Sequence, residues 1–199
     1  MKPSISDKPA LSIIFGLILF FSSTSVCYLP PSYSQLNITS PQTVSNTPGN
    51  STDPQIALYN NNLYVVWSDD STGNGDIYFR RSIDNGTTFD TVNNISQNNT
   101  GSSSDPKIGT HSNNVYIVWT DVSSNKNEVF YRQSVDGGVM FGGLKELSKT
   151  RSINGEFALY PRIITSGNNV YVAWQDKVLG GNEIFFRASN DGGNKFTGI

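Results

Sequence analysis

One unit of sequence occurs three times in this chain, and no other feature limits its fold as strongly. Each copy contains, in the same order, a proline-containing start, an apolar run that ends in tryptophan, a run that ends in arginine and a Ser-x-Asp turn. These four parts occupy 53–56, 62–67, 76–80 and 82–89 in the first copy, 105–108, 114–119, 128–132 and 134–141 in the second, and 160–163, 169–174, 183–187 and 189–196 in the third. Trp67, Trp119 and Trp174 therefore lie 52 and 55 residues apart. A period of this length indicates a fold of stacked supersecondary units.

Within each copy, the pattern is that of short antiparallel strands. Runs of β-branched and aromatic residues alternate with clusters of Asn, Gly, Asp and Ser, and no helical periodicity follows residue 34. In the first copy we expect strands near 55–59, 63–68, 76–83 and 89–95. The second of these is apolar on both faces, so it must be covered on both sides, as a sheet between two neighbouring sheets would be. The sequence predicts an all-β fold, a β-propeller of four-stranded blades, with three blades at about 53–100, 105–150 and 157–199.

The Ser-x-Asp turn belongs to a longer pattern, Ser-x-Asp-x-Gly-x-Thr-Phe. Its positions are Ser82, Asp84, Gly86, Thr88 and Phe89 in the first copy, Ser134, Asp136, Gly138 and Phe141 in the second, and Ser189, Asp191, Gly193 and Phe196 in the third. This pattern resembles the Asp-box between the third and fourth strands of blades in sialidase-like propellers. Met140 and Lys195 stand where the box has threonine. The resemblance implies part of a six-bladed sialidase-like propeller.

We expect these boxes to be structural. An aspartate such as Asp84 can accept hydrogen bonds from backbone N–H groups of its own turn, and Gly86 can take a left-handed conformation. Phe89 would pack back beneath the hairpin. In the sialidase-like family the boxes lie at the periphery, so Asp84, Asp136 and Asp191 are expected to shape turns rather than to catalyse.

The resemblance also implies what catalysis would need. Sialidases of this family use a tyrosine nucleophile assisted by a glutamate, an aspartate acid/base, and three arginines that converge on the substrate carboxylate. Arg80, Arg132 and Arg187 occupy the same place in successive repeats, so they would not converge on one ligand.

Two residues depart from the repeat. Glu156 and Tyr160 are therefore the candidate remnant of a catalytic pair. Arg162 follows Tyr160 closely, but its segment, 160–163, aligns with 53–56 of the first copy, so we interpret Arg162 as a repeat element. Without a recognisable catalytic set, the chain is more consistent with a protein that is not an enzyme.

One loop has the spacing of a cation site. Asp70, Thr72, Asn74 and Asp76 place oxygen ligands at alternate positions, as the start of a calcium loop does. No glutamate follows at the distance of a bidentate ligand, so a solvated loop between strands is the favoured interpretation and calcium the alternative. No cofactor is expected.

The N-terminus and the composition indicate export. Basic Lys2 and Lys8 precede an apolar run at 11–21 and then small residues, the order of a secretory signal peptide, here 1–34. The net charge is -2 and only 15% of residues are charged, which argues against a nucleic-acid partner. We therefore expect a secreted or cell-surface protein.

The repeat has unmatched pieces at its ends. Residues 41–46 resemble the expected fourth strand of a blade and precede the first copy, so we interpret them as an orphan outer strand. The third copy stops before its own fourth strand. Three blades do not close a ring, because propellers typically have four to eight. The chain is either a fragment of a longer product or, if complete, a head-to-tail homodimer that exchanges this strand.

These observations favour a non-catalytic extracellular propeller, or part of one, that binds carbohydrate or another surface protein. The alternative is an exo-α-sialidase-type glycoside hydrolase that is complete only in a longer chain or a dimer. A structural component of the cell envelope is a third class that fits the composition.

Overall fold

The computed structural model describes residues 40–97, 101–123, 126–148, 157–178 and 181–197. Every regular element in these ranges is a strand, and the strands form three antiparallel sheets. The first sheet contains β1 (Ser51–Tyr59), β2 (Asn62–Asp69), β3 (Asp76–Ser82) and β4 (Asn93–Asn94). The second contains β5 (Ser102–His111), β6 (Asn114–Ser123), β7 (Lys126–Ser134) and β8 (Lys145–Glu146), and the third β9 (Leu159–Ser166), β10 (Asn169–Val178) and β11 (Gly181–Ser189). These ranges contain no helix of the length and hydropathy that a membrane crossing requires.

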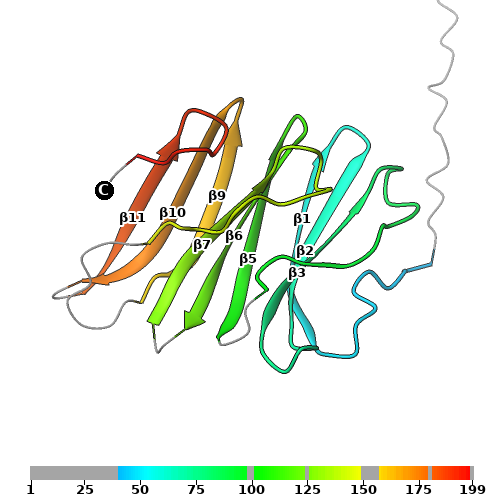
Figure 1. Cartoon of the computed structure of the whole chain (residues 1–199), viewed down its shortest axis with the longest axis horizontal. Helices are drawn as coiled ribbons and strands as arrows, with labels where there is room; N and C mark the ends of the chain where they lie inside the picture. Colours follow the sequence, from blue (N-terminus) through cyan, green and yellow to red (C-terminus); the bar gives the residue numbers. More distant parts are fainter. Residues whose placement is uncertain (1–39, 98–100, 124–125, 149–156, 179–180, 198–199) are drawn as a thin grey trace, which may run out of the picture. The chain divides into compact units, whose positions relative to one another are not determined.

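Each sheet is one propeller blade, formed by one sequence repeat. Strands that follow one another in the chain are neighbours in the sheet, and the three sheets stand side by side in sequence order (Figure 1). The blades approach one another at their first strands, because β1 contacts β5 and β5 contacts β9. The predicted all-β architecture of three propeller blades is confirmed.

Tight hairpins join the first two strands of every blade. Asn60, Ser112 and Gly167 occupy the same place in the three hairpins, and all have φ between 53° and 58°. Glycine and asparagine adopt this left-handed backbone at low cost, and a primed turn of this kind follows the twist of the strands it joins. The Asn-rich and Gly-rich breaks in the sequence therefore set the register of the blades.

Two apolar clusters fill the spaces between the blades. The first joins blades one and two and consists of Tyr64, Val66, Ile77, Phe79, Ile95, Val115, Ile117 and Trp119. The second joins blades two and three and consists of Tyr116, Val118, Val129, Tyr131, Leu147, Ala158, Val170, Val172 and Trp174. The hydrophobic core is thus a pair of interfaces between sheets, and an isolated blade would lack it.

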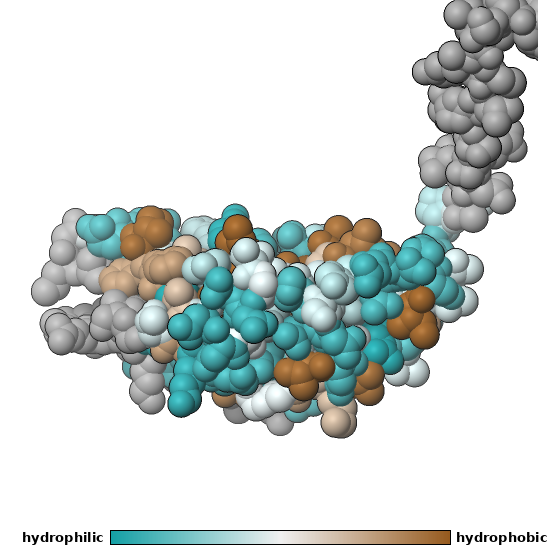
Figure 2. Space-filling view, turned by 90° about the horizontal axis from the view of Figure 1, so that it is seen from above, coloured by the Kyte–Doolittle hydropathy of each residue, from teal (hydrophilic) through white to brown (hydrophobic). Residues whose placement is uncertain are grey.

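The middle blade shows why the second strands are apolar on both faces. Residues Val115 to Thr120 of β6 are all buried, because blade one covers one face and blade three the other. In β10 of blade three, buried and half-buried residues alternate from Val170 to Asp176. Figure 2 shows one surface of the molecule, on which hydrophobic residues form separate groups among hydrophilic ones.

The outer strands differ from the prediction. The strand expected at 89–95 is reduced to Asn93–Asn94, and the carbonyls of Phe89 and Asp90 accept hydrogen bonds from the Arg80 side chain. The third sheet has three strands within the described residues.

Within this structure, residues 41–46, where an orphan outer strand is expected, do not form a strand. Arg80 Nη1 donates to Val44 O at 2.7 Å, and Gln42 Nε2 donates to Gly86 O at 2.7 Å. Asn46 has a φ of 45°, which interrupts extended backbone. Side chains rather than a neighbouring strand make these contacts, so residues 42–46 lie on blade one without joining its sheet. The expected signal peptide at 1–34 falls outside the described residues.

Candidate functional site

Each blade carries a β-bulge in its first strand. The register between the first and second strands shifts between Thr52 and Gln55, between Ser104 and Lys107, and between Leu159 and Arg162. In every case two residues, the second of them proline, stand opposite one tryptophan, so the first strand has one extra residue; the pairs are Asp53-Pro54, Asp105-Pro106 and Tyr160-Pro161. Proline suits a bulge because it has no N–H to leave unpaired in the ladder.

The first bulge residue has a left-handed backbone in all three blades. The φ angles are 52° at Asp53, 52° at Asp105 and 56° at Tyr160. Aspartate tolerates this conformation, whereas a bulky residue such as tyrosine is a genuine outlier there. Such strain costs on the order of 1–3 kcal/mol and persists where the surroundings impose it, often at binding sites.

The bulges of blades two and three assemble a charged group. Lys107 Nζ donates to a carboxylate oxygen of Asp105, and to Pro106 O at 3.0 Å. Across the blade boundary, Arg162 Nη1 lies 3.9 Å from the other carboxylate oxygen of Asp105. One carboxylate therefore stands between an ammonium group and a guanidinium group that come from different blades.

The exposed members of this group face solvent. The Arg162 side chain is 63% exposed and Tyr160 is 57% exposed, whereas the Lys107 side chain is largely covered. We call Asp105, Lys107, Tyr160 and Arg162 the bulge cluster. It offers a bidentate cation, a carboxylate and an aromatic ring on adjacent first strands. Such a set can hydrogen-bond to hydroxyl or carboxylate groups and pack against an apolar ring face.

The Asp-boxes close turns within their own blades. Asp84 accepts hydrogen bonds from Ser82 Oγ at 2.6 Å, Thr88 N at 2.8 Å and Thr88 Oγ1 at 2.6 Å. The Ser82 hydroxyl and the Thr88 contacts lower the pKa of Asp84 to about 2. Gly86 takes a φ of 83°, and its N–H donates to Ser82 Oγ.

The two boxes without threonine keep the turn. Backbone N–H groups of Met140 and Lys195 donate to Asp136 and Asp191, at 3.0 Å and 2.9 Å. These bonds, followed by those from the box serines, lower the pKa of both aspartates. The hydrogen bond from the Thr88 hydroxyl to Asp84 has no counterpart in the other two boxes, because Met140 and Lys195 have no hydroxyl group.

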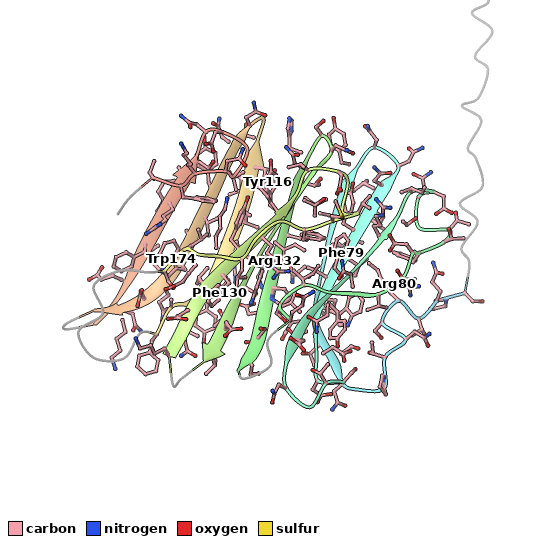
Figure 3. All side chains as sticks on the ribbon, viewed as in Figure 1. Phe79, Arg80, Tyr116, Phe130, Arg132 and Trp174 are labelled. Carbon is pink, nitrogen blue, oxygen red and sulfur yellow. The ribbon has the colours of Figure 1, made fainter. Side chains whose placement is uncertain are left out.

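The repeated arginines lie on different sheets. Arg80 belongs to β3 and binds the carbonyls of Phe89 and Asp90 in its own blade and that of Val44, which precedes the blade. Burial lowers the pKa of Arg132 and of Arg187, on β7 and β11. Figure 3 labels Arg80 and Arg132, which come from separate blades. The structure does not bring these residues together as a triad.

Oxygens of the candidate cation loop take part in hydrogen bonds within the loop and with Asn50. Asp70 accepts hydrogen bonds from Asn50 N at 2.6 Å and Asn50 Nδ2 at 2.9 Å. Thr72 Oγ1 donates to Asp76 Oδ2 at 2.7 Å and contacts Asn74 O at 3.3 Å. Among the residues that the structure describes, no three His, Cys, Asp or Glu side chains gather closely enough to hold a metal ion.

Of the catalytic candidates, Tyr160 lies in the bulge cluster, and Glu156 lies outside the described residues. Sequence reasoning passed over Asp105 and Lys107, and it treated Arg162 as a mere repeat element. The available signal was the proline at the same place in every repeat, because a repeated X-Pro within a strand indicates a bulge.

No family model matches the sequence, and no curated protein matches it. Solved structures do share the fold. The sialidase of Trypanosoma rangeli has a TM-score of 0.57 at 15% identity, over 75% of this chain and 30% of the sialidase. A family 117 glycoside hydrolase of the marine bacterium Zobellia galactanivorans has a TM-score of 0.50 at 12% identity, over 72% of this chain and 53% of that protein.

An endo-arabinase of Bacteroides thetaiotaomicron has a TM-score of 0.53 at 14% identity, over 76% of this chain and 61% of the arabinase. This chain thus spans about a third of the sialidase and less than two thirds of the other two proteins. Identities this low establish the fold alone, which is that of part of a sialidase-like propeller.

Proposed function

We propose that this chain is a non-catalytic, extracellular propeller segment that binds carbohydrate through the bulge cluster. The observation that carries the proposal is the position of Arg162, which is exposed and faces Asp105 from the neighbouring blade at 3.9 Å. A guanidinium group held in this way retains donors for an acidic or hydroxyl-rich ligand. Tyr160 adds an exposed ring held in a strained conformation.

The fold neighbours support a carbohydrate ligand. They are a sialidase, a family 117 glycoside hydrolase and an endo-arabinase, and all three names refer to action on sugars. Because a fold hosts many functions, the bulge cluster rather than the likeness decides the ligand class. Its cationic and aromatic groups favour sugars that carry a carboxylate.

Binding of free sialic acid and of neutral sugars to the full chain tests this proposal by calorimetry. We expect saturable binding of the acidic sugar and a loss of roughly tenfold or more in Arg162→Ala, since a charged hydrogen bond contributes about 1.5–3 kcal/mol. Lys195→Ala is the matched control, because it removes an exposed cation from an Asp-box turn. Equal binding by wild type and both variants would contradict the proposal.

The second candidate function is a sialidase-type glycoside hydrolase completed by a longer chain or a dimer. The likeness to the Trypanosoma rangeli sialidase favours it. Arg80, Arg132 and Arg187 lie in separate blades, so we expect no turnover of a fluorogenic sialoside by this chain. Turnover that persists through purification and disappears in Tyr160→Phe would establish catalysis instead.

The extracellular location is proposed from residues 1–34 alone. The charged, apolar and small-residue segments have the order of a signal peptide. Expression in a secreting host should release into the medium a protein whose mass and N-terminal sequence begin at Gln35. Retention of the intact N-terminus in the cell would count against export.

A further inference from the structure

The blade interfaces follow one rule. In blade one, Tyr64 and Phe79 stack at 6.1 Å, and Phe79 meets Phe141 of the next Asp-box edge to face at 5.0 Å. In blade two, Tyr116 and Tyr131 stack at 6.4 Å. Tyr131 meets Phe196 of the next Asp-box at 5.0 Å. We call each stacked pair the aromatic pair of its blade, and it packs on the Asp-box of the blade that follows.

The Asp-box glycine makes room for this contact. A Cβ on Gly138 would lie 2.7 Å from Phe79 Cζ, and a Cβ on Gly193 would collide with Tyr131 Oη. Polar bonds complete each interface. Arg81 Nη1 donates to Gly137 O at 2.9 Å, and Lys145 Nζ donates to Gly193 O at 2.8 Å.

Blade three carries an aromatic pair on which no Asp-box packs among the residues that the structure describes. Tyr171 and Phe186 stack at 6.1 Å with an interplanar angle of 17°, as in the other two blades. Phe186 is 55% exposed, whereas its counterparts Phe79 and Tyr131 are buried. Ile184 beside it is 75% exposed, and its counterparts Ile77 and Val129 are fully buried.

Blade one carries the complementary half. A groove of about 550 Å³ lies over its Asp-box and first two strands, lined by residues that include Ile56, Leu63, Val65, Gly86 and Phe89. Their counterparts in blade two, such as Ile108, Val115 and Phe141, pack against the aromatic pair of blade one. A Cβ on Gly86 would meet only Leu63 of the same blade. The space that an aromatic pair fills at the other two boxes is therefore open here.

One polar contact of the groove is already made. Gln42 Nε2 donates to Gly86 O, the carbonyl that corresponds to Gly193 O, which Lys145 binds. Gln42 and Val44 line the groove together with the apolar side chains of blade one. Residues 42–46 thus supply the polar part of a blade interface without its aromatic part.

We infer that a second copy of this chain docks here, with Tyr171 and Phe186 of one copy in the blade-one groove of the other. Each copy presents an aromatic pair on blade three and an open groove on blade one. These are the two halves of the interface that the chain already forms twice between its own blades, so the proposed contact repeats an established one. Two copies joined in this way cover the open faces of blade one and blade three in both chains, which gives a closed head-to-tail dimer. This contact is independent of the bulge cluster and of any carbohydrate.

Light scattering and sedimentation of the full chain test the dimer. Phe186→Asp alters the aromatic pair, and Ile56→Asp alters the groove at a residue that is 66% exposed. Either variant should weaken dimerisation by at least about a hundredfold, because it buries an unpaired charge in the contact. Ile83→Asp changes an exposed apolar residue of an Asp-box and serves as the control.

Mixing the two variants identifies the geometry. An Ile56→Asp chain has an intact aromatic pair and a Phe186→Asp chain has an intact groove, so the mixture should form a heterodimer with one native interface. Circular dichroism confirms that each variant keeps the wild-type fold. A wild-type monomer at micromolar concentration, open-ended polymers, or a dimer that survives Ile56→Asp would each overturn the inference.

Discussion

At the scale of single residues, short polar side chains hold the loops of this fold in place. Asp69 illustrates this, because burial raises its pKa while hydrogen bonds from Ser51, Ser71 and Thr47 outweigh that effect and lower it to about 2. The Asp-box aspartates do the same for the turns between the third and fourth strands. Stability at these positions comes from hydrogen bonds to ionised carboxylates.

Asp136→Ala should destabilise the protein by about 1–3 kcal/mol, since it leaves the N–H groups of Val139 and Met140 and the Ser134 hydroxyl without their acceptor. Urea unfolding measures the loss. Val139→Ala, at an exposed position of the same turn, should change stability little. Equal stability of Asp136→Ala and wild type would show that water replaces the carboxylate.

The contribution of the blade-one Asp-box to the free energy of unfolding should fall over a defined range of acidic pH. The folded-state pKa of Asp84 is about 2, below its ordinary value of 3.8. Its contribution is therefore complete above about pH 4 and is lost as the pH falls through about 2. Urea unfolding at successive pH values should show a smaller loss of stability over this range in Asp84→Asn than in wild type. Parallel pH profiles would contradict the assignment.

At the scale of elements, one bulge and one turn illustrate how a strand is fitted to its neighbours. The bulge at Tyr160 redirects a strand, and the turn at Gly138 receives a ring from the preceding blade. Both positions require a left-handed backbone, with φ of 56° and 83°. Glycine meets that requirement without strain, whereas a bulky residue such as tyrosine does not.

Tyr160→Gly should raise the free energy of unfolding by about 1 kcal/mol, because it removes the strain of a left-handed tyrosine that is mostly exposed. If the ring contacts carbohydrate, the same change should weaken binding. Asp53→Gly, at the equivalent bulge, should have a smaller effect on stability, since aspartate tolerates this backbone. Thermal unfolding and calorimetry on both variants separate the two effects.

Gly138→Ala should destabilise the protein by about 1–3 kcal/mol more than Gly86→Ala. Both substitutions impose the same backbone strain, at a φ of 83°. Only at Gly138 does the added methyl group meet Phe79 of the preceding blade. A Cβ on Gly86 meets only the flexible end of Leu63, so the difference between the two variants in urea reports chiefly the contact with Phe79. A difference near zero would mean that Phe79 moves aside freely.

The sequence predicted the elements better than it predicted the site. The repeat and the apolar runs at the second strands were sufficient to predict three stacked sheets, and the middle sheet has both faces covered as that pattern requires. The bulge cluster depends on Asp105 and Arg162 approaching across a blade boundary, and no local pattern encodes that distance. Residues 41–46 resemble 90–94 in sequence, but in this structure Val44 accepts a hydrogen bond from the Arg80 side chain, a contact that no local pattern predicts.

At the scale of the whole molecule, the protection of backbone amides against hydrogen exchange should depend on the blade to which they belong. The middle blade has both faces covered, whereas blades one and three each have one open face. In the undocked chain, such as the Phe186→Asp variant, we expect the amides of Val115 to Thr120 in β6 to exchange with solvent most slowly. Those of β11 should exchange faster, because its open face includes the exposed Ile184. Hydrogen exchange by mass spectrometry measures both segments. Faster exchange in β6 would contradict this order.

Because each aromatic pair fits the Asp-box of the following blade, a gene of this kind can gain blades by duplication of one repeat. Consider a duplicated copy of 105–156 inserted in frame after residue 156. Its Asp-box would meet the aromatic pair of the blade before it, and its own aromatic pair would meet the Asp-box of the blade after it, without any change in its own sequence. The number of blades could therefore change by recombination alone, and each gain would convert a solvent-facing surface into an interior one.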